Sequence, residues 1–361
     1  TIHCRWRYAG RQRGRRGTTA AGARQRQPEI HVITTGVPPA VEPPFPSDAR
    51  RPRVFVTGGR GGIGRHVVKQ LAGAGWSVTA LSRRLHPDTP GITAIQHDLR
   101  AGGKDEWAAI LRGHDALVHC AFLNDDLTGE ANGRLADAAA AAGLGRFVHL
   151  STTSVYPTVA SGTLDETWPY ADPPPDVYTA TKIAIERAIL ARRTQIHVTV
   201  LQPTNVIDPA GGWWTTGVLD LMRSGRMMLI NGGAGTANLV KVEDVAWAAV
   251  RALETHHDSG QRFILTDGHA HRWGTYLKRL EAQTGRPSLQ TIDADAAKKL
   301  SAKLYARSLG ALWLSFVRRI TRERPLFPMN DLTIDRFASE ARFSPALAQR
   351  VLGFQPESAL T

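Results

Sequence analysis

Short apolar runs alternate with stretches of helical periodicity from residue 54 onward. Apolar runs bounded by turn-forming residues predict strands over 54–56, 77–81, 92–96, 116–119, 147–150 and 196–201. Helical spacing of apolar residues predicts a helix that begins near residue 63 and further helices over 104–111, 130–142 and 179–193. Strands that alternate with helices favour a parallel sheet covered on both faces. The predicted fold class is therefore α/β, with a doubly wound parallel sheet.

Residues 1–50 lack this periodicity and are predicted to form a disordered Arg- and Pro-rich tail. The chain of 361 residues carries a net charge of +13, but residues 1–53 hold 11 Arg, no Lys and three acidic residues. A targeting segment, a nucleic-acid-binding arm and non-native upstream sequence would each explain this composition. We favour the third, because the chain begins with Thr1 and composition alone is weak evidence for function. With the charge concentrated in the tail, no nucleic-acid partner is expected.

Cysteine usage and hydropathy limit the class of protein. Cys4 and Cys120 are the two cysteines of the chain, which is too few for a disulfide framework and typical of a reducing compartment. No apolar run reaches the length of a membrane span, and the longest candidate, 309–317, is interrupted by Ser315. A cytoplasmic location is predicted.

The first strand is followed by the turn T-G-G-R-G-G-I-G, which extends from Thr57 to Gly64. Glycine allows the backbone to turn sharply and to approach a pyrophosphate closely, and the start of the next helix offers unpaired N–H groups. In this strand–turn–helix context the motif predicts a dinucleotide site. The expected cofactor-binding residues of the turn are Thr57, Gly58, Gly61, Gly62, Ile63 and Gly64.

The end of the second strand indicates which dinucleotide is bound. NAD-binding folds place an acidic residue there to hold the ribose hydroxyls, whereas this chain has Ser82 followed by Arg83 and Arg84. A guanidinium can bind a 2′-phosphate through paired hydrogen bonds. NADP is therefore favoured over NAD, and the alternative is that both arginines are merely solvated.

Tyr178 and Lys182 lie one helical turn apart at the start of a predicted helix. A phenol titrates near pH 10, and a neighbouring ammonium favours the phenolate. The pair can therefore supply an acid and base at neutral pH. Upstream, the strand over 147–150 ends in a cluster of hydroxyl residues, one of which could donate a hydrogen bond to a substrate oxygen.

With these motifs the chain resembles the extended short-chain dehydrogenase/reductase family, in its NAD(P)-dependent epimerase/dehydratase-like branch. The resemblance begins near residue 54 and reaches the C-terminus, and it rests on T-G-G-R-G-G-I-G, Asp98-Leu99, L-V-H-C-A (117–121), S-T-T-S-V-Y (151–156), Y-T-A-T-K (178–182), Q-P-T-N-V-I-D-P (202–209), N-L-V-K-V-E-D-V-A (238–246) and V-L-G-F-Q-P (351–356).

The resemblance implies a Rossmann-type fold with a smaller C-terminal substrate lobe. It gives Tyr178 the role of acid and base, and Thr152 that of the assisting hydroxyl with Thr153 as a substitute. It also places Tyr178 and Lys182 among the cofactor-binding residues, with Lys182 holding the nicotinamide ribose. Asp98 and Leu99 would lie near the adenine, and Ala121 near the middle of the cofactor.

Departures from the family pattern narrow the expected reaction. Sugar-nucleotide dehydratases of the family carry an Asp-Glu pair where this chain has Thr153 and Ser154, so dehydration by that route is disfavoured. Gln202 replaces the family's usual Arg before Pro. The family's frequent asparagine in the helix after the fourth strand has no clean match, with Asn124 and Asn132 as alternatives.

Three parts are predicted along the chain: the tail 1–50, an NAD(P)-binding Rossmann domain over 51–265 with a substrate-lobe insertion at about 205–237, and a C-terminal substrate lobe over 266–361. The lobe ends where family members usually continue into another helix, so truncation stays an open alternative. It is similar to 3β-hydroxysteroid dehydrogenase-like and dihydroflavonol reductase-like members.

Within the predicted lobe, residues 305–320 combine an apolar stripe with flanking basic residues. We favour a helix that packs on the domain or covers the pocket, and the alternative is peripheral contact with a membrane surface. The pair Trp213-Trp214 is expected to line the pocket or pack the lobe. His256, His257, His269 and His271 lie in predicted loops without a supporting set of carboxylates, and no metal is expected.

The sequence thus predicts an NAD(P)-dependent oxidoreductase that transfers hydride between nicotinamide and a secondary alcohol or ketone of a small, hydrophobic molecule. The alternatives are a sugar-nucleotide 4-epimerase and a non-catalytic NADP-sensing protein. The expected partner is a small-molecule substrate, and the expected assembly is a monomer or a homodimer.

Overall fold

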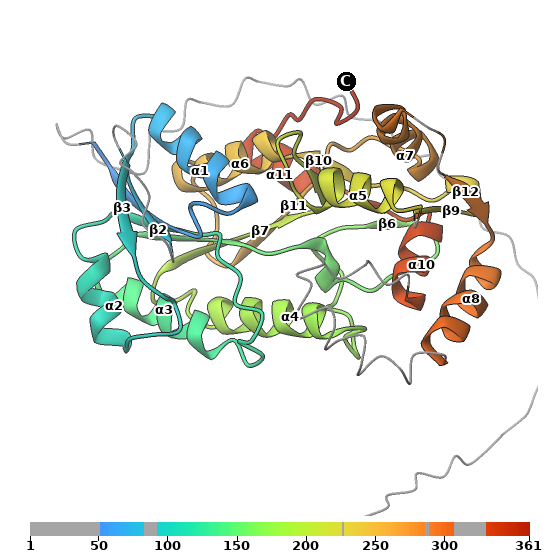
Figure 1. Cartoon of the computed structure of the whole chain (residues 1–361). Helices are drawn as coiled ribbons and strands as arrows, with labels where there is room; N and C mark the ends of the chain where they lie inside the picture. The colour runs from blue at the N-terminus through green and yellow to red at the C-terminus, as the bar shows by residue number, and fades with distance from the viewer. Residues whose placement is uncertain (1–50, 83–91, 226, 286, 288, 307–329) are drawn as a thin grey trace, which may run out of the picture. The chain divides into compact units, whose positions relative to one another are not determined.

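A parallel sheet of seven strands lies at the centre of the described chain (Figure 1). The computed structural model describes residues 51–82, 92–225, 227–285, 287, 289–306 and 330–361. The strands, in the spatial order β11-β7-β5-β4-β1-β2-β3, are β11 (Gln261–Leu265), β7 (His197–Pro203), β5 (Arg146–Leu150), β4 (Ala116–His119), β1 (Arg53–Thr57), β2 (Ser77–Ser82) and β3 (Ile92–Gln96). All neighbouring strands are parallel, which confirms the predicted α/β class.

Helices cover both faces of this sheet (Figure 1). One face carries α1 (Gly62–Gly73), α6 (Val242–Glu254) and α11 (Ala346–Leu352), and the other carries α2 (Lys104–Leu111), α3 (Glu130–Ala141) and α4 (Val177–Leu190). Each face has its own apolar core, built from alternate residues of the same strands. In β1, for example, Val54 and Val56 pack toward α1 and Phe55 packs toward α2, as the two-residue period of a strand requires.

The predicted strands and helices are all present, with ends that differ by a few residues. The largest difference at a functional position is in α4, which begins at Val177 rather than at residue 179. Asp176 caps this helix, because its Oδ1 accepts a hydrogen bond from the Thr179 N–H at 2.6 Å. Tyr178 therefore lies in the first turn of α4.

The order in which successive strands are added to the sheet reverses between β1 and β4. The strands β2 and β3 lie on one side of β1, and β4, β5, β7 and β11 lie on the other. All of them present their carboxyl ends at one edge, because all are parallel. In open α/β sheets, ligands bind outside this edge at the point of reversal.

A second, smaller region is assembled from segments that are distant in the sequence. Three two-stranded parallel sheets belong to it: β6 (Thr163–Leu164) with β13 (Arg342–Phe343), β8 (Asn205–Ile207) with β10 (Leu239–Lys241), and β9 (Met228–Ile230) with β12 (Gln290–Ile292). Its helices are α5 (Val218–Arg223), α7 (Trp273–Glu281), α8 (Ala294–Ala306) and α10 (Asp331–Ala338). Residues from the predicted insertion and from the C-terminal part share one apolar core.

Three expectations lie outside the described residues. These are the disordered tail over 1–50, the roles of Arg83 and Arg84, and most of the amphipathic segment over 305–320. None of the described helices combines the length and the apolarity that crossing a bilayer requires.

Candidate active site

The glycine turn after β1 is held by contacts between backbones. Gly58 adopts a positive φ of 64°, and its carbonyl oxygen accepts a hydrogen bond from the Gly61 N–H at 2.8 Å. A Cβ added to Gly58 would lie 2.8 Å from the Ala121 backbone, and one added to Gly64 would overlap the Gly58 carbonyl. Both positions therefore require glycine for the turn itself.

Gly62, by contrast, has open space around its Cα. An added Cβ would have no neighbour within 4 Å, and the residue is exposed at the start of α1. No side chain caps this helix and no acidic residue lies in its first turn. The start of α1 can therefore accept an anionic group of a ligand.

Two of the expected cofactor-binding residues differ in their placement. Ala121 follows β4 and adjoins the turn, at the point where the strand order reverses. Thr57 is fully buried, and its Oγ1 lies 2.6 Å from His119 Nδ1 and accepts a hydrogen bond from the Ala121 N–H at 3.3 Å. Thr57 therefore supports the turn from beneath, and the expectation that it contacts the cofactor stays a prediction.

Asp98 and Leu99 follow β3 at the same edge of the sheet. Leu99 is buried, whereas the half-exposed Asp98 carboxylate pairs with Arg100 at 3.3 Å. Arg100 also donates two hydrogen bonds of 2.8 Å to Asp125, one from Nε and one from a terminal nitrogen. This arginine, which the sequence did not single out, connects the ends of β3 and β4.

Tyr178 and Lys182 lie in the first two turns of α4, but their environments differ. Tyr178 is 41% exposed and lines the pocket described below, whereas Lys182 is 5% exposed. The Lys182 ammonium donates a hydrogen bond to the Leu150 carbonyl at 3.2 Å and lies 4.6 Å above the Phe122 ring. Phe122 also packs edge-on against Tyr178. It was missed by the sequence analysis, although it directly follows Ala121.

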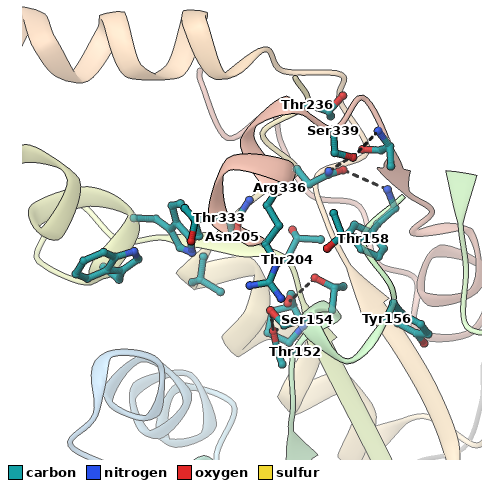
Figure 2. Close-up of a pocket in the computed structure, with 18 of the residues that line it drawn as sticks. Thr152, Ser154, Tyr156, Thr158, Thr204, Asn205, Thr236, Thr333, Arg336 and Ser339 are labelled. Atoms are coloured by element: carbon teal, nitrogen blue, oxygen red, sulfur yellow. Dashed lines mark hydrogen bonds between the residues drawn. The ribbon is translucent and has the colours of Figure 1, made fainter. Parts of the chain in front are cut away.

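The structure separates the two candidate threonines. Thr153 is buried and its hydroxyl points toward the Pro203 carbonyl at 3.5 Å. Thr152 is only partly buried, and its Oγ1 accepts a hydrogen bond from the Ser154 N–H at 3.1 Å. Figure 2 shows the Thr152 and Ser154 side chains together at one side of the pocket. Thr152 therefore presents the available hydroxyl.

The Tyr178 phenol is influenced by burial and by three neighbours. Its pKa is raised overall, mainly by burial and also by the charge of Asp176, although the hydrogen bond with Thr152 and the positive charge of Arg336 lower it. The hydroxyls of Thr152 and Tyr178 are thus brought together as expected. The cation that lowers the pKa of the phenol is Arg336 of α10, so the prediction that Lys182 does so is wrong.

Burial lowers the pKa of Lys182 to about 8, and the negative charge of Glu186 raises it. Glu186 follows Lys182 by one turn of α4 and is fully buried. Its carboxylate accepts hydrogen bonds from Ser151, from Gln202 at 3.1 Å and from Tyr170 at 3.0 Å. A neutral amide thus donates to this carboxylate where the family pattern has an arginine.

Neither candidate asparagine lies at the pocket. Asn124 is exposed, and Asn132 is buried between His119, to which it is hydrogen-bonded, and Asp126. Burial lowers the pKa of His119 to about 4, which keeps the imidazole neutral at physiological pH. Asn132 and His119 therefore support the turn through Thr57.

A cavity of about 690 Å³ connects the glycine turn with the hydroxyl residues and the smaller region. Its lining includes Gly62 and Ile63 of the turn, and Thr152 and Tyr178. Apolar side chains form much of the rest, and those contributed by the smaller region and the loops next to it are Pro157, Val159, Leu164, Val206, Trp213, Trp214, Trp273, Phe337, Ala341 and Phe343. The expectation that Trp213 and Trp214 line the pocket is confirmed.

The histidines of the predicted loops have structural contacts. His271 bonds Asp267 at 2.6 Å, and the same buried carboxylate accepts a hydrogen bond from the Ala359 N–H at 2.8 Å. His257 bonds Thr199 on β7 at 2.7 Å. Over the described ranges, no three His, Cys, Asp or Glu side chains are arranged to hold a metal ion.

Comparison with known proteins agrees with this geometry. A model of the NAD dependent epimerase/dehydratase family matches residues 54–265. The human sterol-4-alpha-carboxylate 3-dehydrogenase, decarboxylating, is 28% identical over 250 residues, and the alignment covers 63% of this chain and 65% of that protein. The 3-beta-hydroxysteroid dehydrogenase of Mycolicibacterium neoaurum is 26% identical over 339 residues, covering 84% of this chain and 87% of the relative.

Among solved structures, MoeE5 in complex with UDP-glucose and NAD superposes with a TM-score of 0.63. The two chains are 21% identical, and the superposition covers 85% of this chain and 94% of MoeE5. At this identity the similarity supports the fold.

Gly64→Ala and Gly62→Ala should separate the turn's structure from its ligand contacts. Gly64→Ala should lower the free energy of unfolding by about 1–3 kcal/mol, because the added methyl overlaps the Gly58 carbonyl. Gly62→Ala should leave unfolding unchanged, because its surroundings are open, and should weaken dinucleotide binding. Thermal unfolding without ligand and fluorescence titration with NADPH measure the two effects. Equal stability of the two variants would contradict this account.

Proposed function

Because the chain belongs to the NAD dependent epimerase/dehydratase family, we propose that it is an oxidoreductase that interconverts a secondary alcohol and a ketone on a small, largely apolar molecule. One observation carries this proposal: a single cavity joins the glycine turn, the Thr152 and Tyr178 hydroxyls and a largely apolar wall. The printed activities of the two relatives, on a sterol and on a steroid hydroxyl, support a substrate of this kind.

The residues present fit a dinucleotide. The turn has glycine where side chains would collide, and it leaves Gly62 open at an uncapped helix start. Gly58, Gly61, Gly62 and Ile63 would hold the pyrophosphate, and the Asp98–Leu99 segment would lie near the adenine. The bound nicotinamide would supply or accept the hydride.

Residues of this chain transfer the proton. Tyr178 Oη donates a proton to the substrate oxygen during reduction and accepts it during oxidation. Thr152 Oγ1 donates a hydrogen bond to the same oxygen and fixes its position. Lys182, one turn of α4 beyond Tyr178, would hold the nicotinamide ribose, and its buried ammonium is anchored on the Leu150 carbonyl. Thr153 and Ser154 supply no carboxylate, so water removal by the route of the dehydratases is disfavoured.

A 4-epimerase differs from this proposal in its cofactor cycle. An epimerase retains its cofactor and shows no net turnover of it, whereas a dehydrogenase consumes one equivalent for each product. The largely apolar wall favours a hydrophobic alcohol over a sugar nucleotide. A cytoplasmic location, a monomeric or dimeric assembly and the absence of a nucleic-acid partner stay predictions.

We further propose that NADP is the preferred cofactor. Arg83 and Arg84 follow Ser82, where NAD-binding folds carry an acidic residue. Arg60 is exposed on the glycine turn and adds positive charge at the same edge of the sheet.

A double variant, Arg83→Ala with Arg84→Ala, tests the cofactor preference. It should weaken NADPH binding about tenfold or more and change NADH binding little, since charged hydrogen bonds to the 2′-phosphate are lost. Fluorescence titration gives both dissociation constants, and Arg350→Ala on the exposed side of α11 is the matched control. Similar affinities of the native protein for the two cofactors would contradict the preference.

Tyr178→Phe tests the proposed chemistry. Reduction of 3-oxosteroids and simple ketones should fall by about 100- to 10,000-fold, because the proton donor is lost. Thermal unfolding and NADPH binding should stay unchanged, and these two measurements are the control for folding. Undiminished turnover in this variant would contradict the assignment. Tightly bound cofactor with interconversion of UDP-sugars and no net turnover would favour the epimerase.

The Lys182–Glu186 pair predicts a pH dependence. If the charged Lys182 is required, kcat/KM should fall as the pH rises through about 8. Glu186→Gln removes the charge that raises the Lys182 pKa, so the decline should begin about one pH unit lower. The exposed Glu130→Gln is the control, and it should leave the profile unchanged. If kcat/KM of Glu186→Gln declined at the same pH as that of the native protein, Glu186 would carry no charge that acts on Lys182.

A further inference from the structure

Arg336 is a cation inside the cavity that has no hydrogen-bond acceptor among the described residues. It lies on α10, is half-buried and belongs to the pocket lining. Figure 2 shows its side chain reaching from α10 toward Thr152 and Ser154. Burial lowers its pKa, which indicates that its charge is poorly solvated. A guanidinium in this position is stabilised when a ligand supplies an anion.

The acidic residues that line the cavity already have other hydrogen-bond or ion-pair partners. Asp176 accepts the capping hydrogen bond of α4 from Thr179, and it acts on Arg336 through its charge. Asp208 forms an ion pair with Arg65 of α1 and accepts a hydrogen bond from the Ala210 N–H at 2.9 Å. Among the described residues of the lining, Arg336 is therefore the cationic side chain that is available to a ligand.

The position of Arg336 indicates where a bound anion would lie relative to the substrate carbon that reacts. Its charge lowers the pKa of Tyr178, and its guanidinium extends toward Thr152. These two hydroxyls would hold the oxygen of the substrate. An anion bound by Arg336 would therefore lie on the side of the cavity where the carbon that carries this oxygen is held.

We propose that Arg336 binds a substrate carboxylate, and that the substrate is a 3-hydroxy or 3-oxo carboxylic acid with an apolar body. This inference rests on the proposed function and names its substrate class. Oxidation of such a 3-hydroxy acid transfers one hydride from its carbinol carbon to the dinucleotide and one proton to Tyr178, and it leaves the 3-oxo acid.

A single carboxylate suits this cavity better than a diphosphate. Arg336 is the one cationic side chain of the described lining, and the remaining wall is largely apolar. A planar guanidinium forms two parallel hydrogen bonds with one carboxylate. A nucleoside diphosphate would bring about two negative charges into a described lining that has one cation and also holds the Asp176 carboxylate, and like charges destabilise one another.

The test compares an acid with its neutral ester on the full chain. The probes are 3-hydroxydecanoate and methyl 3-hydroxydecanoate, each with NADP⁺ and with NAD⁺, and UDP-glucose is added as a competitor. The native protein should favour the acid, and Arg336→Gln should lower the acid-to-ester ratio of kcat/KM by about 30-fold or more. Arg336→Lys should lower the ratio less, because it keeps the charge but loses the paired geometry. Arg350→Gln, an exposed arginine of α11, should leave the ratio unchanged.

The outcomes distinguish this inference from the function on which it rests. If the native protein turned over the ester as well as the acid, the carboxylate site would be overturned, whereas the proposed oxidoreductase function would still hold. An equal loss of both substrates in Arg336→Gln would also overturn it, since the arginine would then act only on Tyr178 or on folding. Competition by UDP-glucose that is lost in the variant would assign Arg336 to a diphosphate instead.

Binding without turnover gives an independent measurement. Trp213 and Trp214 line the cavity, so 3-hydroxydecanoate should quench the intrinsic fluorescence of the native protein. The quenching should be saturable and should weaken at least about tenfold in Arg336→Gln. If no alcohol is oxidised at all, the proposed function fails, and saturable quenching that depends on Arg336 still supports the carboxylate site. Quenching that does not depend on Arg336 overturns it.

Discussion

The close approach of two backbone segments, the turn after β1 and the residue after β4, is the constraint on which the site depends. Gly58 and Ala121 meet at a distance that admits no side chain on the glycine, and Gly64 packs against the Gly58 carbonyl. This contact lies where the strand order reverses. The turn, the start of α1 and the end of β4 are therefore packed together, and a buried chain of polar groups through Thr57 and His119 supports them from beneath.

Helix α4 connects this surface with the chemistry. Tyr178, Lys182 and Glu186 follow one another at intervals of one turn, so a single helix presents a phenol to the cavity, an ammonium behind it and a carboxylate in the core. Burial opposes the charge of both Lys182 and Glu186. Each charge therefore depends on its neighbours, and the hydroxyl and amide donors around Glu186 replace the water that it would have in solution. The acid–base chemistry of the site is in this way coupled to the packing of β5, β7 and α4.

The sequence predicted the parts of the site that depend on local geometry. The glycine turn and the Tyr178–Lys182 spacing are visible in consecutive residues, because a tight turn and a helix face have fixed periods. The choice of Thr152 over Thr153 came from the family pattern, and the structure agrees because Thr153 is turned into the core. Arg336 and Phe122 could not be predicted, since their positions depend on how α10 and the β4 loop pack in three dimensions. The burial of Thr57 beneath the turn was not predicted either, because a motif does not tell which of its side chains are exposed and which support the turn.

The central sheet and the smaller region contribute different parts of the site, and this difference has a physical reason. The sheet positions the turn and α4 through backbone hydrogen bonds and apolar cores, which tolerate little change. The far wall of the cavity is assembled from short segments around residues 157–164, 205–218 and 330–343, each held by a small parallel pair of strands or a single helix. Arg336 shows that this wall also acts on the chemistry, because a residue of α10 alters the acidity of the Tyr178 phenol. Substrate choice and proton transfer are therefore not independent here, since the side chain that would recognise the substrate also sets the charge next to the proton donor.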